Sequence, residues 1–300
     1  MSLALGILAA LVAAVLYSVG VALQSVEARQ APDEESLRAS LIKHLATRPR
    51  WRVGTSCVVG GWATQAAALG LVPITIVQPA LAVSVVALLF IAVRFFGETV
   101  RVREVVAALA IVVGVGGLVV GSPGQSHIHA ALLPLALGGM GVLGAVALAP
   151  YVLRGHHGFG ALVAFSAGLA YAWTGFSTKF LVDGISSGAW VAAALWLGAT
   201  AAAGGVGLLS EMTALQSRSP ISVFPVVLVV QIVVAMLLAP LLAGASWSPG
   251  PLLIAGLAVS LAVLAAGTRA LAGSRAVGRA MATEEVEGDG AGAGGSGARV

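Results

Sequence analysis

Charged residues are scarce in this 300-residue sequence. Only 9% of the residues are Asp, Glu, Lys or Arg, whereas a soluble domain carries about 25%. Hydrophobic residues make up 59%, and the mean hydropathy is +1.01. No soluble fold has enough interior to hide so much apolar surface, but the hydrocarbon of a bilayer can solvate it. The composition therefore excludes an ordinary soluble domain and predicts an integral membrane protein.

Several chemical signatures are missing as well. The single cysteine, Cys57, excludes an intrachain disulfide. No glycine-rich segment ends in Lys-Ser or Lys-Thr, the pattern of a nucleotide-binding loop, so ATP-driven transport by this chain alone is not expected. No nucleophile–base set stands out either. We therefore expect a protein that is not an enzyme and that has no cofactor and no resident metal site.

Long apolar runs are what the sequence has instead. They do not alternate with polar residues, as the short strands of a membrane barrel do, and each approaches the roughly 20 residues that a spanning helix needs. The expected fold is all-α, a polytopic membrane bundle of about nine transmembrane helices. Their predicted ranges are about 3–23, 53–71, 74–93, 104–121, 131–150, 159–182, 190–215, 220–243 and 250–271.

The basic residues indicate how these spans are oriented. Cytoplasmic loops of membrane proteins collect Lys and Arg. With the N-terminus outside, 15 of the 16 basic residues fall in inside loops or the inside tail, and the sixteenth, Lys179, lies within a span. This pattern predicts a multi-pass, N-out and C-in protein of the cell membrane, as in a bacterial inner membrane. It also favours membrane lipid headgroups, and not nucleic acid, as the partner of these charges.

The two halves of the chain share a pattern. Residues 68–79 align without a gap over residues 214–225, which places Pro79 on Pro225. The same register pairs Gly61 with Gly207 and Gln65 with Glu211, and a looser match pairs Gly20 with Gly175. The second span runs outward while its counterpart runs inward, so the repeats are inverted, as in many secondary transporters. Chance similarity between Ala- and Val-rich segments is the alternative.

This symmetry predicts four regions. Residues 1–123 form a first transporter repeat that includes a cytoplasmic loop at 24–52, and residues 124–158 form a linking span. Residues 159–272 form the second, inverted repeat. The tail at 273–300 is rich in Gly and acidic residues, a composition typical of disorder.

Two ionisable residues lie within predicted spans, where a charge is costly and is therefore a functional candidate. Glu211 belongs to the seventh span and Lys179 to the sixth. For Glu211 the alternative is a structural hydrogen bond or a pair with Arg218. For Lys179 the alternative is snorkelling to the headgroups beside Asp183.

Prolines and neutral polar residues complete the candidate site. Pro79 and Pro225 each free a backbone carbonyl inside a span, which indicates either an irregular segment lining a cavity or a simple kink. The candidate solute contacts are Gln65, Gln78, Pro79, Glu211, Pro225 and Gln231, with Tyr17, Tyr171 and Trp173 as shaping or gating groups and Lys179 as a charge partner. The glycines at 138, 139, 141 and 144 are instead expected to let helices pack closely.

One stretch, Gln65 to Glu98, carries a family pattern. The matching residues are Gln65 at an Asn-like position, Ala68, Pro73, Val77-Gln78-Pro79, Ala82, Ser84 and Val85, followed by Phe96-Gly97-Glu98 and later by Gly121-Ser122-Pro123. Through these residues the chain resembles the EamA-like drug/metabolite transporter superfamily and, within it, the NIPA-type magnesium transporters. The resemblance implies nine or ten helices in two inverted halves around a central cavity.

One departure from the family bears on the solute. The family's second span has a Gly-Glu pair where this chain has Gly61-Trp62, and divalent cations prefer carboxylate oxygens. We therefore expect a passive or ion-coupled secondary carrier that moves a small metabolite or ion by alternating access. A NIPA-type Mg²⁺ transporter and a non-transporting membrane scaffold or subunit are the alternatives. Membrane lipid and the solute are the expected partners, and a homodimer is left open.

Overall fold

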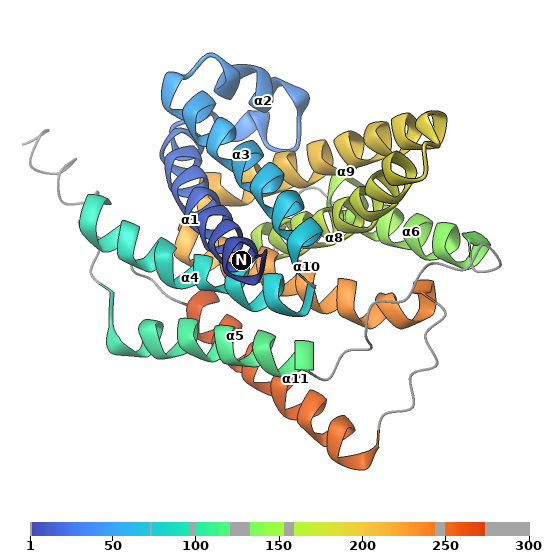
Figure 1. Cartoon of the computed structure of the whole chain (residues 1–300). Helices are drawn as coiled ribbons and strands as arrows, with labels where there is room; N and C mark the ends of the chain where they lie inside the picture. The colour runs from blue at the N-terminus through green and yellow to red at the C-terminus, as the bar shows by residue number, and fades with distance from the viewer. Residues whose placement is uncertain are drawn as a thin grey trace, which may run out of the picture.

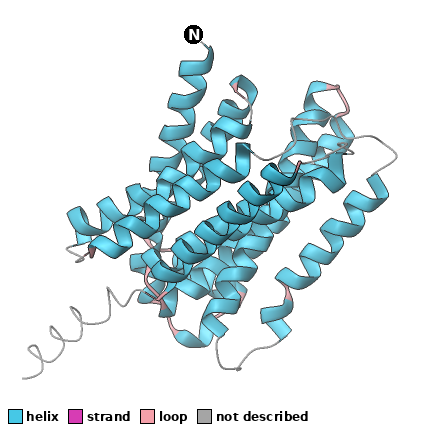
Figure 2. Ribbon diagram, turned by 90° about the horizontal axis from the view of Figure 1, so that it is seen from below, coloured by secondary structure: helices cyan, strands magenta, loops and turns pink. Residues whose placement is uncertain are grey.

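The computed structural model describes residues 2–72, 74–96, 100–120, 133–152, 159–243 and 250–273. Every regular element within these ranges is a helix, which confirms the all-α prediction (Figures 1 and 2). The helices are α1 (Ser2–Arg29), η1 (Asp33–Glu35), α2 (Ala39–Ala46), α3 (Pro49–Leu71), α4 (Ile74–Phe96), α5 (Val102–Val120), α6 (Leu133–Ala147), α7 (Ala149–Val152), α8 (Phe159–Ser186), α9 (Trp190–Ser217), α10 (Pro220–Ala243) and α11 (Pro251–Ala272).

Four of these helices are long and apolar enough to cross a membrane: Leu3–Arg29, Val102–Val119, Trp190–Ser217 and Pro251–Ala272. Their outward faces carry exposed Leu and Val side chains, which suit hydrocarbon better than water. These helices indicate a membrane protein. A helix also occupies each of the nine predicted ranges, with α6 and α7 sharing the fifth. How many of the nine cross the bilayer remains a prediction.

Two antiparallel hairpins dominate the packing, α1 with α3 and α8 with α9 (Figure 1). Small residues bring their backbones together. A Cβ atom placed on Gly54 of α3 would lie only 2.8 Å from the carbonyl oxygen of Gly20 in α1. In the second hairpin, a Cβ atom on Gly184 of α8 would lie 3.2 Å from the backbone nitrogen of Ala193 in α9. Each pair is therefore a closely packed unit.

The helices α5 and α11 form a third close pair. A Cβ atom on Gly267 of α11 would lie 2.8 Å from the carbonyl oxygen of Ala107 in α5, and a Cβ atom on Gly117 would collide with Ser260. The glycine cluster of α6 behaves differently. At Gly138, Gly139 and Gly141 an added Cβ would meet no described atom within 4 Å. The predicted tight packing at these three residues is therefore wrong within the described part of the chain.

A single large core joins the elements of the two halves. Its buried side chains come from α1, α3, α4, α5, α8, α9, α10 and α11, and include Leu88, Ile111, Val163, Met212, Ile232 and Leu264. The connection between α1 and α3 also contributes, because Leu41 and Leu45 of α2 are fully buried. The amphipathic α2 therefore packs its apolar face on the protein, while Lys43 on its other face is exposed.

Candidate functional site

In the first hairpin, Tyr17 of α1 packs on a glycine of α3. A Cβ atom on Gly61 would lie 3.3 Å from two ring carbons of Tyr17, so the glycine makes room for the ring. The Tyr17 hydroxyl donates a hydrogen bond to Oε1 of Gln65, at 2.7 Å. Gln65 lies one helical turn beyond Gly61, so a single face of α3 supplies both the space for the ring and the acceptor for the hydroxyl.

The second hairpin repeats this arrangement. Tyr171 of α8 packs on Gly207 of α9, where an added Cβ would lie 2.7 Å from the ring. The Tyr171 hydroxyl donates a hydrogen bond to Oε2 of Glu211, at 2.8 Å. The acceptor again follows the glycine by four residues. The sequence alignment paired Gly61 with Gly207 and Gln65 with Glu211, and both pairs occupy matching places in the two contacts.

Glu211 differs from Gln65 in charge and burial. Its side chain is only 4% exposed, and its neighbours Met212 and Leu215 belong to the apolar core. The hydrogen bond from Tyr171 fits the structural alternative for this residue. However, a neutral acceptor such as Gln65 makes the same kind of bond without the cost of a buried charge. A carboxylate at this position can in addition take up a proton or hold a cation.

The two prolines occupy equal places in their helices. Pro79 is the sixth residue of α4, and Pro225 is the sixth residue of α10. Both helices run unbroken through the proline, so the structure favours an in-helix proline over an irregular segment. Pro225 is buried and Pro79 is half-buried.

The structure does not bring all candidates together. The indole nitrogen of Trp173 donates a hydrogen bond to the carbonyl oxygen of Met140, at 2.7 Å, and so ties α8 to α6. Gln231 is half-buried in α10. The side chains of Gln78 and Lys179 lie outside the described part of the structure. The candidate site therefore consists of the two tyrosine contacts.

A buried hydroxyl group next to Glu211 was not expected from the sequence. The Ser210 hydroxyl lies 3.2 Å from the Tyr151 hydroxyl of α7 and 3.4 Å from the Ser166 hydroxyl of α8. Ser166 also donates to the carbonyl oxygen of Ala147. These contacts join α6, α7 and α8 to α9 directly beside the carboxylate. The repeat register pairs Ser210 with Thr64, whereas Thr64 donates to the carbonyl oxygen of Gly60 within its own helix, at 2.7 Å.

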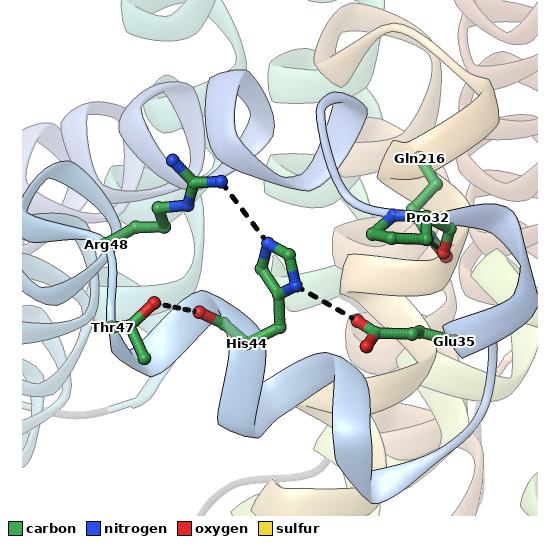
Figure 3. A network of polar contacts seen from close by, with 6 residues as sticks. All are labelled: Pro32, Glu35, His44, Thr47, Arg48 and Gln216. Atoms are coloured by element: carbon green, nitrogen blue, oxygen red, sulfur yellow. Dashed lines mark hydrogen bonds and ion pairs between the residues drawn. The ribbon is translucent and has the colours of Figure 1, made fainter.

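The connection between α1 and α3, together with the first turn of α3, contacts the end of α9 from Met212 onward, directly after Glu211. The Leu37 backbone nitrogen donates to the Thr213 hydroxyl at 3.0 Å, and the Trp51 indole nitrogen lies 3.3 Å from the sulfur of Met212. Ser36 donates to Gln216 at 2.9 Å. Gln216 in turn donates to the carbonyl oxygen of Pro32 at 2.9 Å, and Figure 3 shows these two residues beside one another. We call these contacts of residues 32–51 with α9 the clasp.

Leu37 takes an unusual conformation to reach this place. Its φ is +53°, in the left-handed region that residues with a Cβ seldom adopt. The side chain is buried, at 2% exposure. Beside it, Glu35 and His44 hold the shape of the connection with a contact of 3.5 Å (Figure 3). Packing of the clasp against α9 therefore offsets a local backbone strain.

A surface groove lies beside each of the two hairpins. One has a volume of about 520 Å³ and is lined by Leu16 of α1 and by Pro49, Arg52, Val53, Ser56 and Cys57 of α3. The other has a volume of about 260 Å³ and lies between α6, α8 and α9, beside Trp173. Neither is lined by Gln65 or Glu211. No group of three or more His, Cys, Asp or Glu side chains among the described residues is arranged to hold a metal ion.

Comparisons with known proteins add little about activity. No family model and no solved structure matches the chain. Over 155 residues it is 32% identical to an uncharacterized protein of Corynebacterium glutamicum, a match that covers 50% of this chain and 54% of that protein. The chain thus spans about half the length of the curated relative it matches. That relative's name states no activity, so inferences about function depend on the geometry of the site.

Proposed function

We propose that this chain is an integral membrane secondary transporter that moves a small metabolite or ion by alternating access between two inverted halves. The observation that carries the proposal is the repeated tyrosine contact, Tyr17 with Gly61 and Gln65, and Tyr171 with Gly207 and Glu211. A contact that is built twice, with the same spacing on the partner helix, is what a duplicated transporter half would retain.

Matching helices of the two halves also have matching neighbours. The helix α1 packs on α3 and α4, and α8 packs on α9 and α10. In the same way α4 contacts α5, and α10 contacts α11. The halves meet through α1–α9, α4–α10 and α5–α11. This pattern supports nine spans, four in each half, with α6 and α7 as the linking span.

Glu211 is the residue on which transport would depend. In the proposed mechanism its carboxylate binds the solute or the coupling ion after the Tyr171 hydroxyl has turned away. Gln65, at the matching place in the other half, offers the solute a neutral amide. The clasp closes one side of the bundle next to Glu211, and exchange between the two open states requires it to release α9. The resemblance to the drug/metabolite transporter superfamily agrees with this mechanism.

Flux measurements in proteoliposomes test the proposal. Purified protein is reconstituted and offered a panel of labelled metabolites, monovalent cations and Mg²⁺, with empty liposomes as the background. We expect at least one solute to move, and Glu211→Gln to reduce its flux by tenfold or more. Glutamine still accepts the Tyr171 hydrogen bond, so the fold should persist.

Glu27→Gln is the matched control, because Glu27 is another buried carboxylate, in α1. It should retain the flux. Flux of Mg²⁺ alone would support the NIPA-type alternative. A protein that moves nothing from the panel, or moves a solute equally well as Glu211→Gln, would contradict the proposal.

A further inference from the structure

The groove between α1 and α3 combines an apolar wall with a basic mouth. Five of its lining residues come from α3, at positions 49, 52, 53, 56 and 57, a spacing that puts them on one face of the helix. Leu16 of α1 closes the other side. Leu16 also lies 3.8 Å from where a Cβ on Gly60 would stand, and Gly60 is at the middle of α3. The groove therefore runs from the start of α3 towards its midpoint.

Positive charge gathers where the groove begins. Arg48, Arg50 and Arg52 flank the first turn of α3 and are exposed, and this turn contains no acidic residue. The helix starts at Pro49 without a side-chain cap, so the positive end of its dipole adds to the three guanidinium groups. Deeper in the groove, Val53 and Cys57 present apolar surface. The charge thus changes from cationic to neutral along the axis of the helix.

We infer that this groove binds an anionic phospholipid, with the headgroup phosphate at Arg52 and one acyl chain along Leu16, Val53 and Cys57. Guanidinium groups suit phosphate oxygens, and the apolar wall suits a hydrocarbon chain but offers nothing to a soluble phosphate. The groove's volume of about 520 Å³ leaves room for a chain beside Leu16 and Val53.

The position of α3 agrees with a lipid ligand. It packs along α1, one of the four helices that are long and apolar enough to cross a membrane. Contacts between Gly6 and Val72 at one end and between Gly20 and Gly54 towards the other keep the two helices at the same depth. The groove therefore opens to the bilayer with its basic mouth at the headgroup level. This inference requires α1 to span the membrane, but it does not require transport.

Cys57 allows a direct test, because it is the only cysteine of the chain and lines the groove. The alkylation rate of Cys57 by N-ethylmaleimide is measured on the full-length protein in detergent, with added phosphatidylglycerol or phosphatidylcholine of identical chains. We expect phosphatidylglycerol to slow alkylation at least threefold and saturably, phosphatidylcholine to have little effect, and high salt to weaken the protection. Inorganic phosphate alone should not protect.

Arg52→Gln should abolish most of the protection, because it removes the cation that lines the groove. Arg38→Gln is the matched control, because Arg38 is an exposed arginine that is not part of the groove, and it should behave as the wild type. Native mass spectrometry should likewise find fewer phosphatidylglycerol adducts on Arg52→Gln than on Arg38→Gln. Equal protection by the two lipids, protection by phosphate alone, or full protection of Arg52→Gln by phosphatidylglycerol would overturn the inference.

Discussion

Tyr171 and Glu211 are joined across the α8–α9 hairpin by a hydrogen bond of 2.8 Å from the phenol to the carboxylate. Hydrogen bonds to charged groups contribute about 1.5–3 kcal/mol, against about 0.5–1.5 kcal/mol for neutral pairs. Tyr17 makes the neutral counterpart with Gln65, at 2.7 Å. The two bonds thus allow the same substitution to be compared in a charged and a neutral setting.

We predict that Tyr171→Phe destabilises the protein more than Tyr17→Phe. Both variants keep the ring on its glycine, but only Tyr171→Phe removes the hydrogen bond of a buried carboxylate. Thermal unfolding in detergent measures the difference. In the background of Glu211→Gln, the two tyrosine substitutions should become equally mild. Equal losses in the wild-type background would show that Glu211 has another stabilising partner.

The glycines beneath the two rings should respond differently to alanine. A Cβ on Gly207 would lie 2.7 Å from the ring of Tyr171, whereas a Cβ on Gly61 would lie 3.3 Å from the ring of Tyr17. Gly207→Ala should therefore displace its tyrosine and cost about 1–3 kcal/mol, as overpacking of a core does, and Gly61→Ala should cost less.

Gly205→Ala is the control for this pair, because a Cβ there would meet no described atom within 4 Å. It should be neutral or slightly stabilising, since alanine is the better helix former. Melting temperatures and the near-ultraviolet signal of the tyrosines check the order. If Gly61→Ala were the more harmful variant, the ring of Tyr171 could move aside without cost.

The sequence could predict the helices and, within the candidate site, the pairing of Gln65 with Glu211. Unbroken apolar runs predicted a helix in each of the nine ranges, although α1 continues to Arg29, beyond the predicted end at residue 23. The ungapped register from Gly61 to Pro79 paired Gln65 with Glu211. The tyrosines could not be paired in the same way. Tyr17 precedes Gly61 by 44 residues, but Tyr171 precedes Gly207 by 36, because the connection from α1 to α3 contains the clasp, whereas α8 and α9 are joined by a short turn.

The looser match between α1 and α8 shows why the tyrosines could not be paired from the sequence. Pairing Gly20 with Gly175 is one residue out of the register that the tyrosines keep. The structure places Gly20 against Gly54, but a Cβ on Gly175 would meet no described atom within 4 Å. In an Ala- and Gly-rich helix many small residues match by chance, so the register of a helix pair is decided by side-chain contacts that a sequence does not contain. The clasp was missed for the same reason.

The clasp should control transport if residues 32–51 must leave α9. Ser36 and Gln216, whose side chains meet at 2.9 Å, are replaced by cysteine in the background of Cys57→Ser. A short bis-methanethiosulfonate cross-linker, which forms a disulfide with each thiol and releases sulfinate, should then stop the flux, and a reducing agent should restore it by cleaving these disulfides. Each single-cysteine variant, treated with the same reagent, is the control and should stay active. Full flux through the cross-linked protein would exclude the clasp as a moving part.

Exchanging the acceptors of the two hairpins is the most direct test of their equivalence. The double variant Gln65→Glu and Glu211→Gln moves the carboxylate from the α8–α9 hairpin to the α1–α3 hairpin. Tyr17 already donates to Oε1 of Gln65, so it can donate to a glutamate there, and Tyr171 can donate to the amide oxygen of the new glutamine. Both bonds are preserved, and the total number of carboxylates is unchanged.

We expect this double variant to fold and to recover clearly more flux than Glu211→Gln, which keeps a tenth or less of the wild-type flux. The single variant Gln65→Glu is the control for an added charge and should fold less stably, because it adds a carboxylate at a partly buried position of α3. Initial rates in proteoliposomes and melting temperatures of the four proteins give the comparison. A double variant that folds but is as inactive as Glu211→Gln would mean that the two hairpins resemble one another in packing and not in function.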